Sequence, residues 1–195
     1  MVSHQTTRDH FKKKSFYYKE ANKEAREAFK KTISQLDPST LVYIDESGVD
    51  HKLYRTYGRA PRGIKIYEGI SGKRIQRISM IGGWMKKNFI SPMTFKGGCN
   101  SQVFNTWLKE VLIPQIPPGT TLVMDNATFH KGAQTKRLIR EAKCHLLFLP
   151  TYSPDLNPIE HCWHTIKSKL RSLLPSTQNL QTLIGNVITN TYQLN

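Results

Sequence analysis

Three prolines within nine positions constrain the fold of this chain more than any other feature of its sequence. They follow a mostly apolar run, residues 145–149, that is typical of a buried strand. The prolines prevent that strand from continuing. Asn157 is then in position to cap a helix, with Pro158 at the first helical position, where the missing N–H costs nothing. We therefore expect a rigid connector that presents Glu160 at the start of a helix.

A purely structural interpretation fits the same residues. Asn157 and Glu160 have the spacing of a capping box, with Asn in place of Ser or Thr, so Glu160 could serve only to cap the helix. The local sequence does not separate the two interpretations. Other carboxylates of the chain favour a chemical role for Glu160.

The charge of the 195-residue chain points to a polyanionic partner. Its net charge is +15 and its pI is near 9.9, which indicates nucleic acid first. Residues 52–96 hold eleven Lys and Arg but one acid, whereas a solvated face usually mixes both signs. We expect contacts to the phosphates of double-stranded DNA. The candidate DNA-binding residues are Arg59, Arg62, Lys73, Arg74, Lys131 and Lys167. A solvated helix face is the competing interpretation for Lys167.

The sequence shows no sign of a membrane or a disulfide framework. The N-terminal residues lack an apolar signal region, and no run reaches membrane-spanning length. We expect a cytoplasmic protein. The three cysteines are odd in number and form no CxxC pair. His161, Cys162 and His164 invite a zinc interpretation, but no second ligand pair follows at a recognisable spacing.

Apolar periodicity and turn residues predict an alternating order of elements. We expect helices at 17–36, 101–113, 132–142, 157–173 and 180–192, strands at 41–44, 74–84, 89–95, 121–124 and 145–149, a turn at 46–48 and a basic, hairpin-like excursion at 50–70. Early strands followed by alternation favour an α/β fold, a mixed sheet with helices on both faces. We divide the chain into a basic N-terminal linker helix (1–37), a catalytic domain (38–175) and a C-terminal helix (176–195).

Two aspartates share a setting that favours metal chemistry. Asp45 and Asp125 each follow an apolar strand, and the carboxyl ends of neighbouring parallel strands meet at one edge of a sheet. Two close carboxylates repel unless a cation neutralises them, and oxygen ligands suit Mg²⁺ or Mn²⁺. Glu160 would complete a site for two metals and an in-line displacement at phosphorus. An aspartate at a strand end is otherwise a turn residue or a cap, and nothing local distinguishes Glu46 or Asp155 from these acids.

Three motifs together resemble the catalytic blocks of mariner-type DDE transposases, in particular the bacterial insertion-sequence branch. They are Asp45-Glu46-Ser47, Asp125-Asn126-Ala127-x-x-His130-Lys131, and the stretch from Tyr152 to Trp163 that contains Asn157-Pro158-Ile159-Glu160. The 34 residues between Asp125 and Glu160 are the spacing typical of that superfamily. Thr151, where many relatives have Pro, is a minor departure.

The resemblance implies a ribonuclease-H-like fold with Asp45 and Asp125 on adjacent central strands and Glu160 on a helix beside them. It implies two Mg²⁺ or Mn²⁺ ions held by these acids, cleavage at element ends, and attack of the freed 3′-hydroxyl on target DNA. Asn126 and His130 are candidate accessory residues, with a backbone-bonded loop histidine as the alternative for His130.

The front of the chain departs from full members of the family. Residues 1–36 are too short for the helix-turn-helix modules that precede their catalytic domain. We expect a homodimer, or a partner polypeptide from an upstream frame that carries those modules. One alternative is a non-catalytic DNA-binding remnant or regulator, and another is a ribonuclease-H-like nuclease with no role in transposition.

Overall fold

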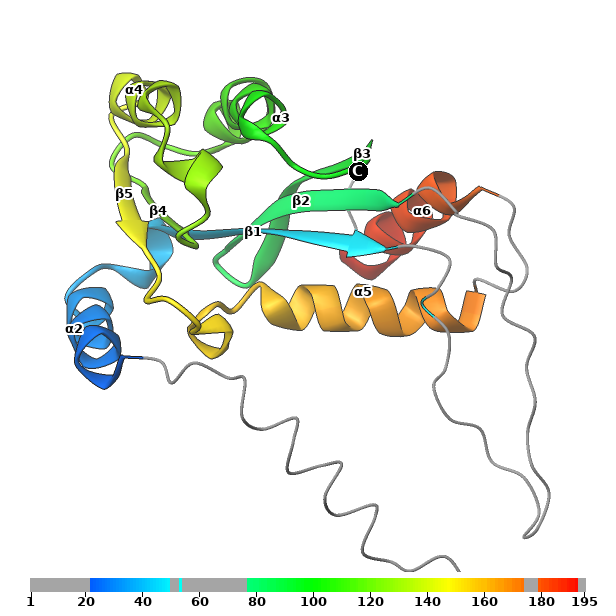
Figure 1. Ribbon diagram of the computed structural model, residues 1–195, viewed down its shortest axis with the longest axis horizontal. Coiled ribbons are helices and arrows are strands. Elements are labelled where there is room, and N and C mark those ends of the chain that lie inside the picture. The colour runs from blue at the N-terminus through cyan, green and yellow to red at the C-terminus, as the bar shows by residue number, and fades with distance from the viewer. Residues whose placement is uncertain (1–21, 50–52, 54–76, 174–178, 193–195) are drawn as a thin grey trace, which may run out of the picture.

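A five-stranded mixed sheet forms the centre of the protein (Figure 1). The computed structural model describes residues 22–49, 53, 77–173 and 179–192. The strands are β1 (Leu41–Val49), β2 (Ile78–Met85), β3 (Asn88–Lys96), β4 (Thr121–Met124) and β5 (His145–Phe148). Their order is β3-β2-β1-β4-β5, with antiparallel pairs on the β3 side of β1 and parallel pairs on the β5 side. The predicted mixed sheet is confirmed.

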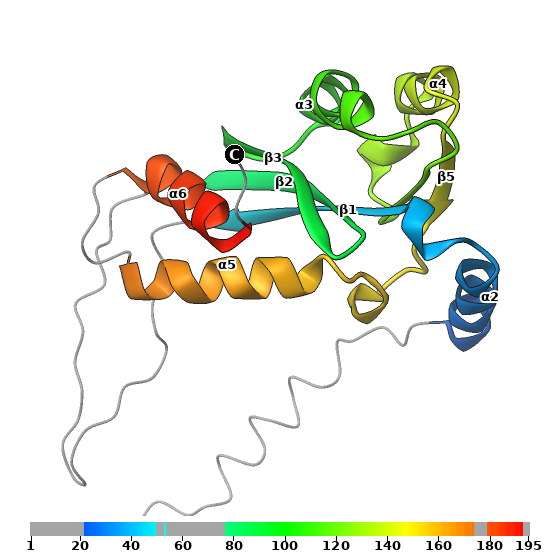
Figure 2. The same cartoon turned by 180° about the vertical axis from the view of Figure 1, so that it is seen from behind.

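Helices cover both faces of this sheet, as the sequence predicts. The long helices are α2 (Lys23–Ser34), α3 (Ser101–Trp107), α4 (Ala133–Glu141), α5 (Glu160–Leu173) and α6 (Leu180–Tyr192). Figures 1 and 2 show α3 and α4 on one face and α5 and α6 on the other. The predicted helix at 101–113 is continuous, but after Trp107 it widens into a π-helical turn, Leu108–Leu112, followed by a 3₁₀ turn, Ile113–Gln115.

Two apolar clusters fill the space between helices and sheet. On the α3/α4 face, Trp107 and Leu108 pack against β1, β2 and β4. On the α5/α6 face, Trp163 and Ile184 pack with Phe89 of β3. Trp163 is 2% exposed, which confirms its interpretation as a core residue rather than a base-stacking platform.

β1 is longer than the sequence predicts. We expected the strand to end at Asp45 and a turn to follow at residues 46–48. Instead β1 continues to Val49, because antiparallel pairing with β2 extends along its whole second half, with Asp45 opposite Gly82 and Val49 opposite Ile78. Successive side chains of a strand point to opposite faces, so Asp45 and Glu46 face different sides of the sheet.

β2 and β3 pair as an antiparallel hairpin. Lys86 and Lys87 form its tip, both with positive φ (50° and 65°), as a tight turn of the primed type requires. Pro92 marks a bulge in β3. A register shift occurs there: two residues, Ser91 and Pro92, face the single Gly82 between paired positions.

Both end helices contact the sheet domain. α6 packs on α5 in the cluster around Trp163. On α2, Phe29 and Ile33 pack against Leu149 and neighbouring strand residues. The division into three segments at 37 and 175 stays a prediction. Apart from Leu53, the predicted excursion at 50–70 lies outside the described residues, and so do Arg59, Arg62, Lys73 and Arg74. None of the described helices is both long and apolar enough to cross a membrane.

Candidate active site

The register of β1 and β4 brings the two aspartates side by side. Leu41 lies opposite Thr121 and Tyr43 opposite Val123 in the parallel pair. The same offset continued places Asp45 opposite Asp125, the first residue after β4. The expectation that Asp125 follows a buried strand is therefore met, and its neighbour Asp45 lies within β1 rather than at its end.

One cavity of about 370 Å³ collects the three predicted acids. β1 supplies Asp45, the loop after β4 supplies Asp125, and the first turn of α5 supplies Glu160. The connector between β5 and α5 forms the rest of the wall. The other lining residues are Asn126, Leu149, Pro150, Thr151, Tyr152, Ser153, Pro154 and Asn157.

The connector is held from two directions. Asn126, a predicted accessory residue, donates from Nδ2 to the main-chain oxygen of Leu149 at 2.6 Å. Arg26 of α2 forms two hydrogen bonds to the carboxylate of Asp155, at 2.9 and 2.5 Å. Asn126 therefore joins the loop after β4 to the start of the connector, and Asp155 faces α2 rather than the cavity acids.

The predicted cap at Asn157 does not form. α5 begins at Glu160, whose N–H donates to the main-chain oxygen of Asn157 at 3.2 Å. The side-chain Oδ1 of Asn157 is buried and has no hydrogen-bond partner among the described residues. The capping-box alternative is therefore wrong as well. A short 3₁₀ turn, Pro154–Leu156, and the main-chain bonds that follow it lead the connector into the helix.

Asp45 is an unusually basic carboxylate. Burial raises its pKa to about 7, and the negative charges of Glu46 and Glu160 add to the rise. The indole Nε1–H of Trp163 donates to Asp45 Oδ2 at 2.9 Å and acts in the opposite direction. Near neutral pH a carboxyl in this position readily gains or loses a proton.

Asp125 belongs to a network that the sequence did not reveal. His130 is fully buried, with Nδ1 2.8 Å from Asp125 Oδ1 and Nε2 3.0 Å from Glu46 Oε1. Burial alone would lower the pKa of His130, but its hydrogen bonds to Asp125 and Glu46 raise it to about 9. The same hydrogen bond lowers the pKa of Asp125. An imidazolium between two carboxylates therefore holds Asp125 ionised.

Glu46 is a residue whose place in the site the sequence analysis missed. The signal that could have identified it is strand alternation: if Asp45 and Glu46 share a strand, they face opposite sides of the sheet. Asp45 then meets α5, and Glu46 meets His130, which packs on Phe104 of α3. His130 uses both ring nitrogens for carboxylates, with a longer contact of 3.3 Å to the main-chain oxygen of Asp125.

The donor set fits a hard divalent cation. Carboxylate oxygens are the ligands that Mg²⁺ and Mn²⁺ prefer, and Asp125 is about half exposed on the cavity side. Within the described ranges no three His, Cys, Asp or Glu side chains already form a compact ligand cluster.

The remaining predicted DNA contacts that the structure describes lie on either side of the sheet. Lys131 is exposed, with Nζ 5.7 Å from the centroid of the Phe148 ring of β5. Lys167 is half-buried on α5. Their geometry does not test contact with DNA, so the DNA-binding roles of Lys131 and Lys167 stay predictions.

The fold and the three-acid cavity together define a protein of the ribonuclease-H-like class. A family model described as DDE superfamily endonuclease matches residues 40–184, so the chain belongs to that family. The Tc1 transposase of Caenorhabditis elegans is 30% identical over 74 residues, 38% of this chain and 27% of its own length. The Tcb2 transposase of Caenorhabditis briggsae is 38% identical over 55 residues, 28% of this chain and 20% of its own length.

Solved structures share the fold at low sequence identity. The Mos1 transposase paired-end complex with the left transposon end superposes with a TM-score of 0.70 at 14% identity, covering 100% of this chain and 64% of that one. The catalytic domain of Mos1 mariner transposase gives a TM-score of 0.57 at 13% identity, covering 91% and 85%. The matches therefore span only part of the full-length relatives.

Proposed function

We propose that this chain is the catalytic part of a transposase that cleaves DNA at element ends and joins the freed ends to target DNA. The observation that carries the proposal is the meeting of Asp45, Asp125 and Glu160 on one cavity. Family membership and the fold shared with Mos1 complexes support it. The substrate is double-stranded DNA, because a net charge of +15 suits a phosphate backbone.

We infer that Asp45, Asp125 and Glu160 would hold two Mg²⁺ or Mn²⁺ ions, since all three acids line one cavity. Bound divalent ions would supply Lewis-acid stabilisation for an in-line displacement at phosphorus. The protein's own groups prepare the site. His130 keeps Asp125 ionised and fixes one of its oxygens, while the half-exposed position of Asp125 leaves room for a backbone phosphate.

Conservative replacements test the assignment. Asp45→Asn, Asp125→Asn and Glu160→Gln should each abolish Mg²⁺-dependent nicking of supercoiled plasmid, because each removes a charged ligand but keeps the side-chain shape. Glu110→Gln is the matched control: its carboxylate pairs with Lys109 and does not line the cavity, so nicking should persist. Wild-type nicking by any of the three variants would remove that residue from the proposed site.

A non-catalytic DNA-binding remnant is the competing function. Titrating this chain with plasmid DNA in the presence of Mn²⁺ separates the two functions. Nicking of the plasmid supports the enzyme, and binding without nicking supports the remnant. The same assay with an upstream helix-turn-helix polypeptide added tests whether this chain acts only with that partner. Cleavage without strand transfer would instead indicate a nuclease with no role in transposition.

Finer assignments belong to the same proposal. We keep the bacterial insertion-sequence branch as the source, a cytoplasmic location at the nucleoid, and a homodimer or a complex with a helix-turn-helix polypeptide as the working form. The relatives named above come from nematodes, and the structural neighbours include paired-end complexes. The paired-end complexes among the structural neighbours favour a paired assembly.

A further inference from the structure

Trp163 has a polar contact that its core position did not predict. Its indole is 2% exposed, and Nε1–H donates to Asp45 Oδ2 at 2.9 Å. Trp163 follows Glu160 by three residues on α5. One turn of helix therefore carries both a cavity acid and the donor that holds a second cavity acid.

The indole is itself fixed in place. The ring of Phe89 meets it edge-on, with centroids 5.3 Å apart and planes at 86°. Ile159 and Ile166 belong to the same buried cluster. A ring packed in this way cannot turn without opening the core, so its N–H is a donor of constant position. Asp45 lies within β1, where pairing with β2 holds its backbone.

We propose that Trp163 is a positioning residue for Asp45. Its N–H holds Oδ2 and so sets the direction in which the carboxylate meets the cavity shared with Asp125 and Glu160. The inference rests on the proposed function, in which Asp45 binds a divalent cation. Hydrogen bonds to ionised groups are among the stronger ones in proteins, and removal of such an outer partner typically weakens metal binding by about 10- to 100-fold.

Trp163→Phe is the central variant, because it keeps a buried aromatic ring and removes only the donor and part of the ring. Trp107→Phe is the matched control. Trp107 is also fully buried, and its Nε1–H donates to the main-chain oxygen of Ser91 at 2.8 Å. Both variants remove an indole and a buried hydrogen bond, but only Trp163 touches a cavity acid.

The measurements separate positioning from stability. Mn²⁺ is titrated calorimetrically into each protein, with and without duplex DNA, and thermal unfolding and nicking are followed on the same samples. Trp163→Phe should raise the Kd for Mn²⁺ by about 10-fold and raise the Mn²⁺ concentration for half-maximal nicking in parallel. Trp107→Phe should leave both values unchanged, while both variants lower the unfolding temperature.

Equal Mn²⁺ affinities for Trp163→Phe and wild type would overturn the inference. If Trp163→Phe does not fold, benzothienylalanine at position 163 keeps the bicyclic shape without the N–H, and the same comparison decides. In an Asp45→Asn background the Trp163 change should have no further effect on Mn²⁺ binding. Wild-type protein that binds Mn²⁺ but does not nick would count against the proposed function alone, and one that binds no Mn²⁺ would count against both.

Discussion

Asp45 lies in β1 and Asp125 directly follows the neighbouring strand β4, yet the surroundings of these two aspartates shift their pKa values in opposite directions. Burial and the charges of Glu46 and Glu160 raise the pKa of Asp45, whereas the hydrogen bond from His130 lowers that of Asp125. Two carboxyl groups whose pKa values differ in this way often take different roles in a site. A cation beside Asp45 would favour its ionised form.

Asp45→Asn should stabilise the cation-free protein at alkaline pH. Because the pKa of Asp45 rises from 3.8 to about 7 on folding, the folded state holds its proton more tightly than the unfolded state. Wild-type stability from this group is therefore present at low pH and is lost as pH rises through about 7. The unfolding temperature of Asp45→Asn should exceed that of wild type at pH 8, and the gap should shrink at pH 5.

Asp155→Asn is the control for this pH effect. Its hydrogen bond with Arg26 lowers the pKa of Asp155, so the same chemical change should not stabilise the protein at pH 8. A gap between Asp45→Asn and wild type that is the same at pH 5 and pH 8 would mean that burial does not shift Asp45 as described.

At the scale of elements, β1 shows what periodicity predicts and what it does not. Residues 41–44 are apolar and were predicted as a buried strand, but Asp45-Glu46-Ser47-Gly48 has the composition of a turn. These four residues nevertheless belong to the strand, because β2, whose paired residues are more than thirty positions away in sequence, supplies their hydrogen-bond partners. Such pairing is non-local, so no window of sequence contains it. The network of Glu46, His130 and Asp125 was missed for the same reason.

Gly82 links the sheet to the site. It lies opposite Asp45, and a Cβ at this position would come within 2.6 Å of the Phe89 ring. Phe89 in turn packs on Trp163. Gly82→Ala should therefore destabilise the protein by about 1–3 kcal/mol, the usual effect of overpacking, as measured by urea unfolding.

Gly185→Ala is the matched control in α6. Nothing lies within 4 Å of a Cβ built there, so the substitution should stabilise the protein by roughly 0.5–1 kcal/mol through helix propensity. If both glycine variants changed stability in the same direction, close approach of Phe89 would not be what requires Gly82.

For the whole molecule, the sequence predicted the architecture and the cavity acids but not the packing of the ends. The order of apolar runs sufficed for the mixed sheet, and the three motifs identified the acids that meet in the cavity. The place of α2 depended on Phe29 and on the Arg26–Asp155 pair, which joins residues 129 positions apart. The apolar stripe of α2 fits a helix partner or the domain equally well, and only the tertiary structure decides.

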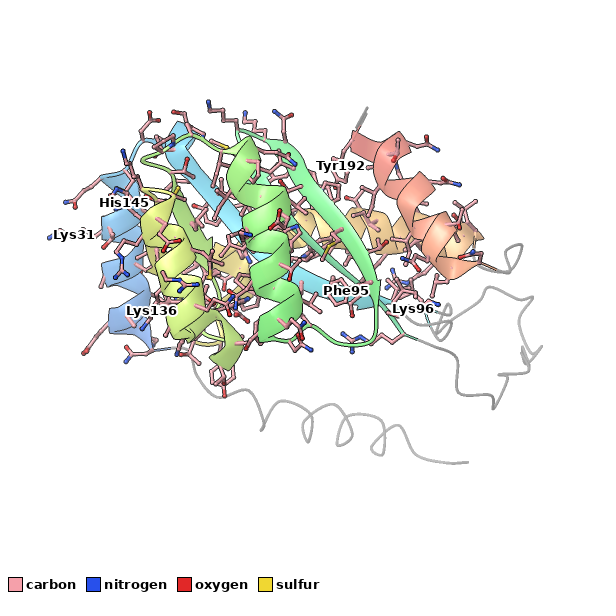
Figure 3. The ribbon with its side chains drawn as sticks, turned by 90° about the horizontal axis from the view of Figure 1, so that it is seen from above. Lys31, Phe95, Lys96, Lys136, His145 and Tyr192 are labelled. Atoms are coloured by element: carbon pink, nitrogen blue, oxygen red, sulfur yellow. The ribbon has the colours of Figure 1, made fainter. Side chains whose placement is uncertain are left out.

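Binding of DNA by this chain should be strongly salt-dependent and nearly indifferent to sequence. Lysine and arginine contacts to phosphates carry no sequence information directly, whereas base readout needs an element inside a groove. Part of the charge lies on the described surface: Figure 3 shows Lys31 of α2 and Lys136 of α4 on the same side of the molecule. We place the main contacts on Arg59, Arg62, Lys73 and Arg74.

Removing one phosphate-binding side chain should reduce the log–log salt slope by about 0.9 on duplex DNA. Alanine at Arg59, Arg62, Lys73 and Arg74 should therefore flatten the slope by roughly 3.6 if all four contribute, and lower affinity equally for element-end and random duplexes in fluorescence anisotropy. Lys30→Ala with Lys109→Ala is the control, because each of these lysines already pairs with a glutamate at 2.8 Å. A preference of ~100-fold for element ends, about 2.7 kcal/mol, would contradict the prediction, since phosphate binding alone cannot generate it. Base-reading groups would then have to lie within this chain, in the 50–70 excursion or in its N-terminal helix.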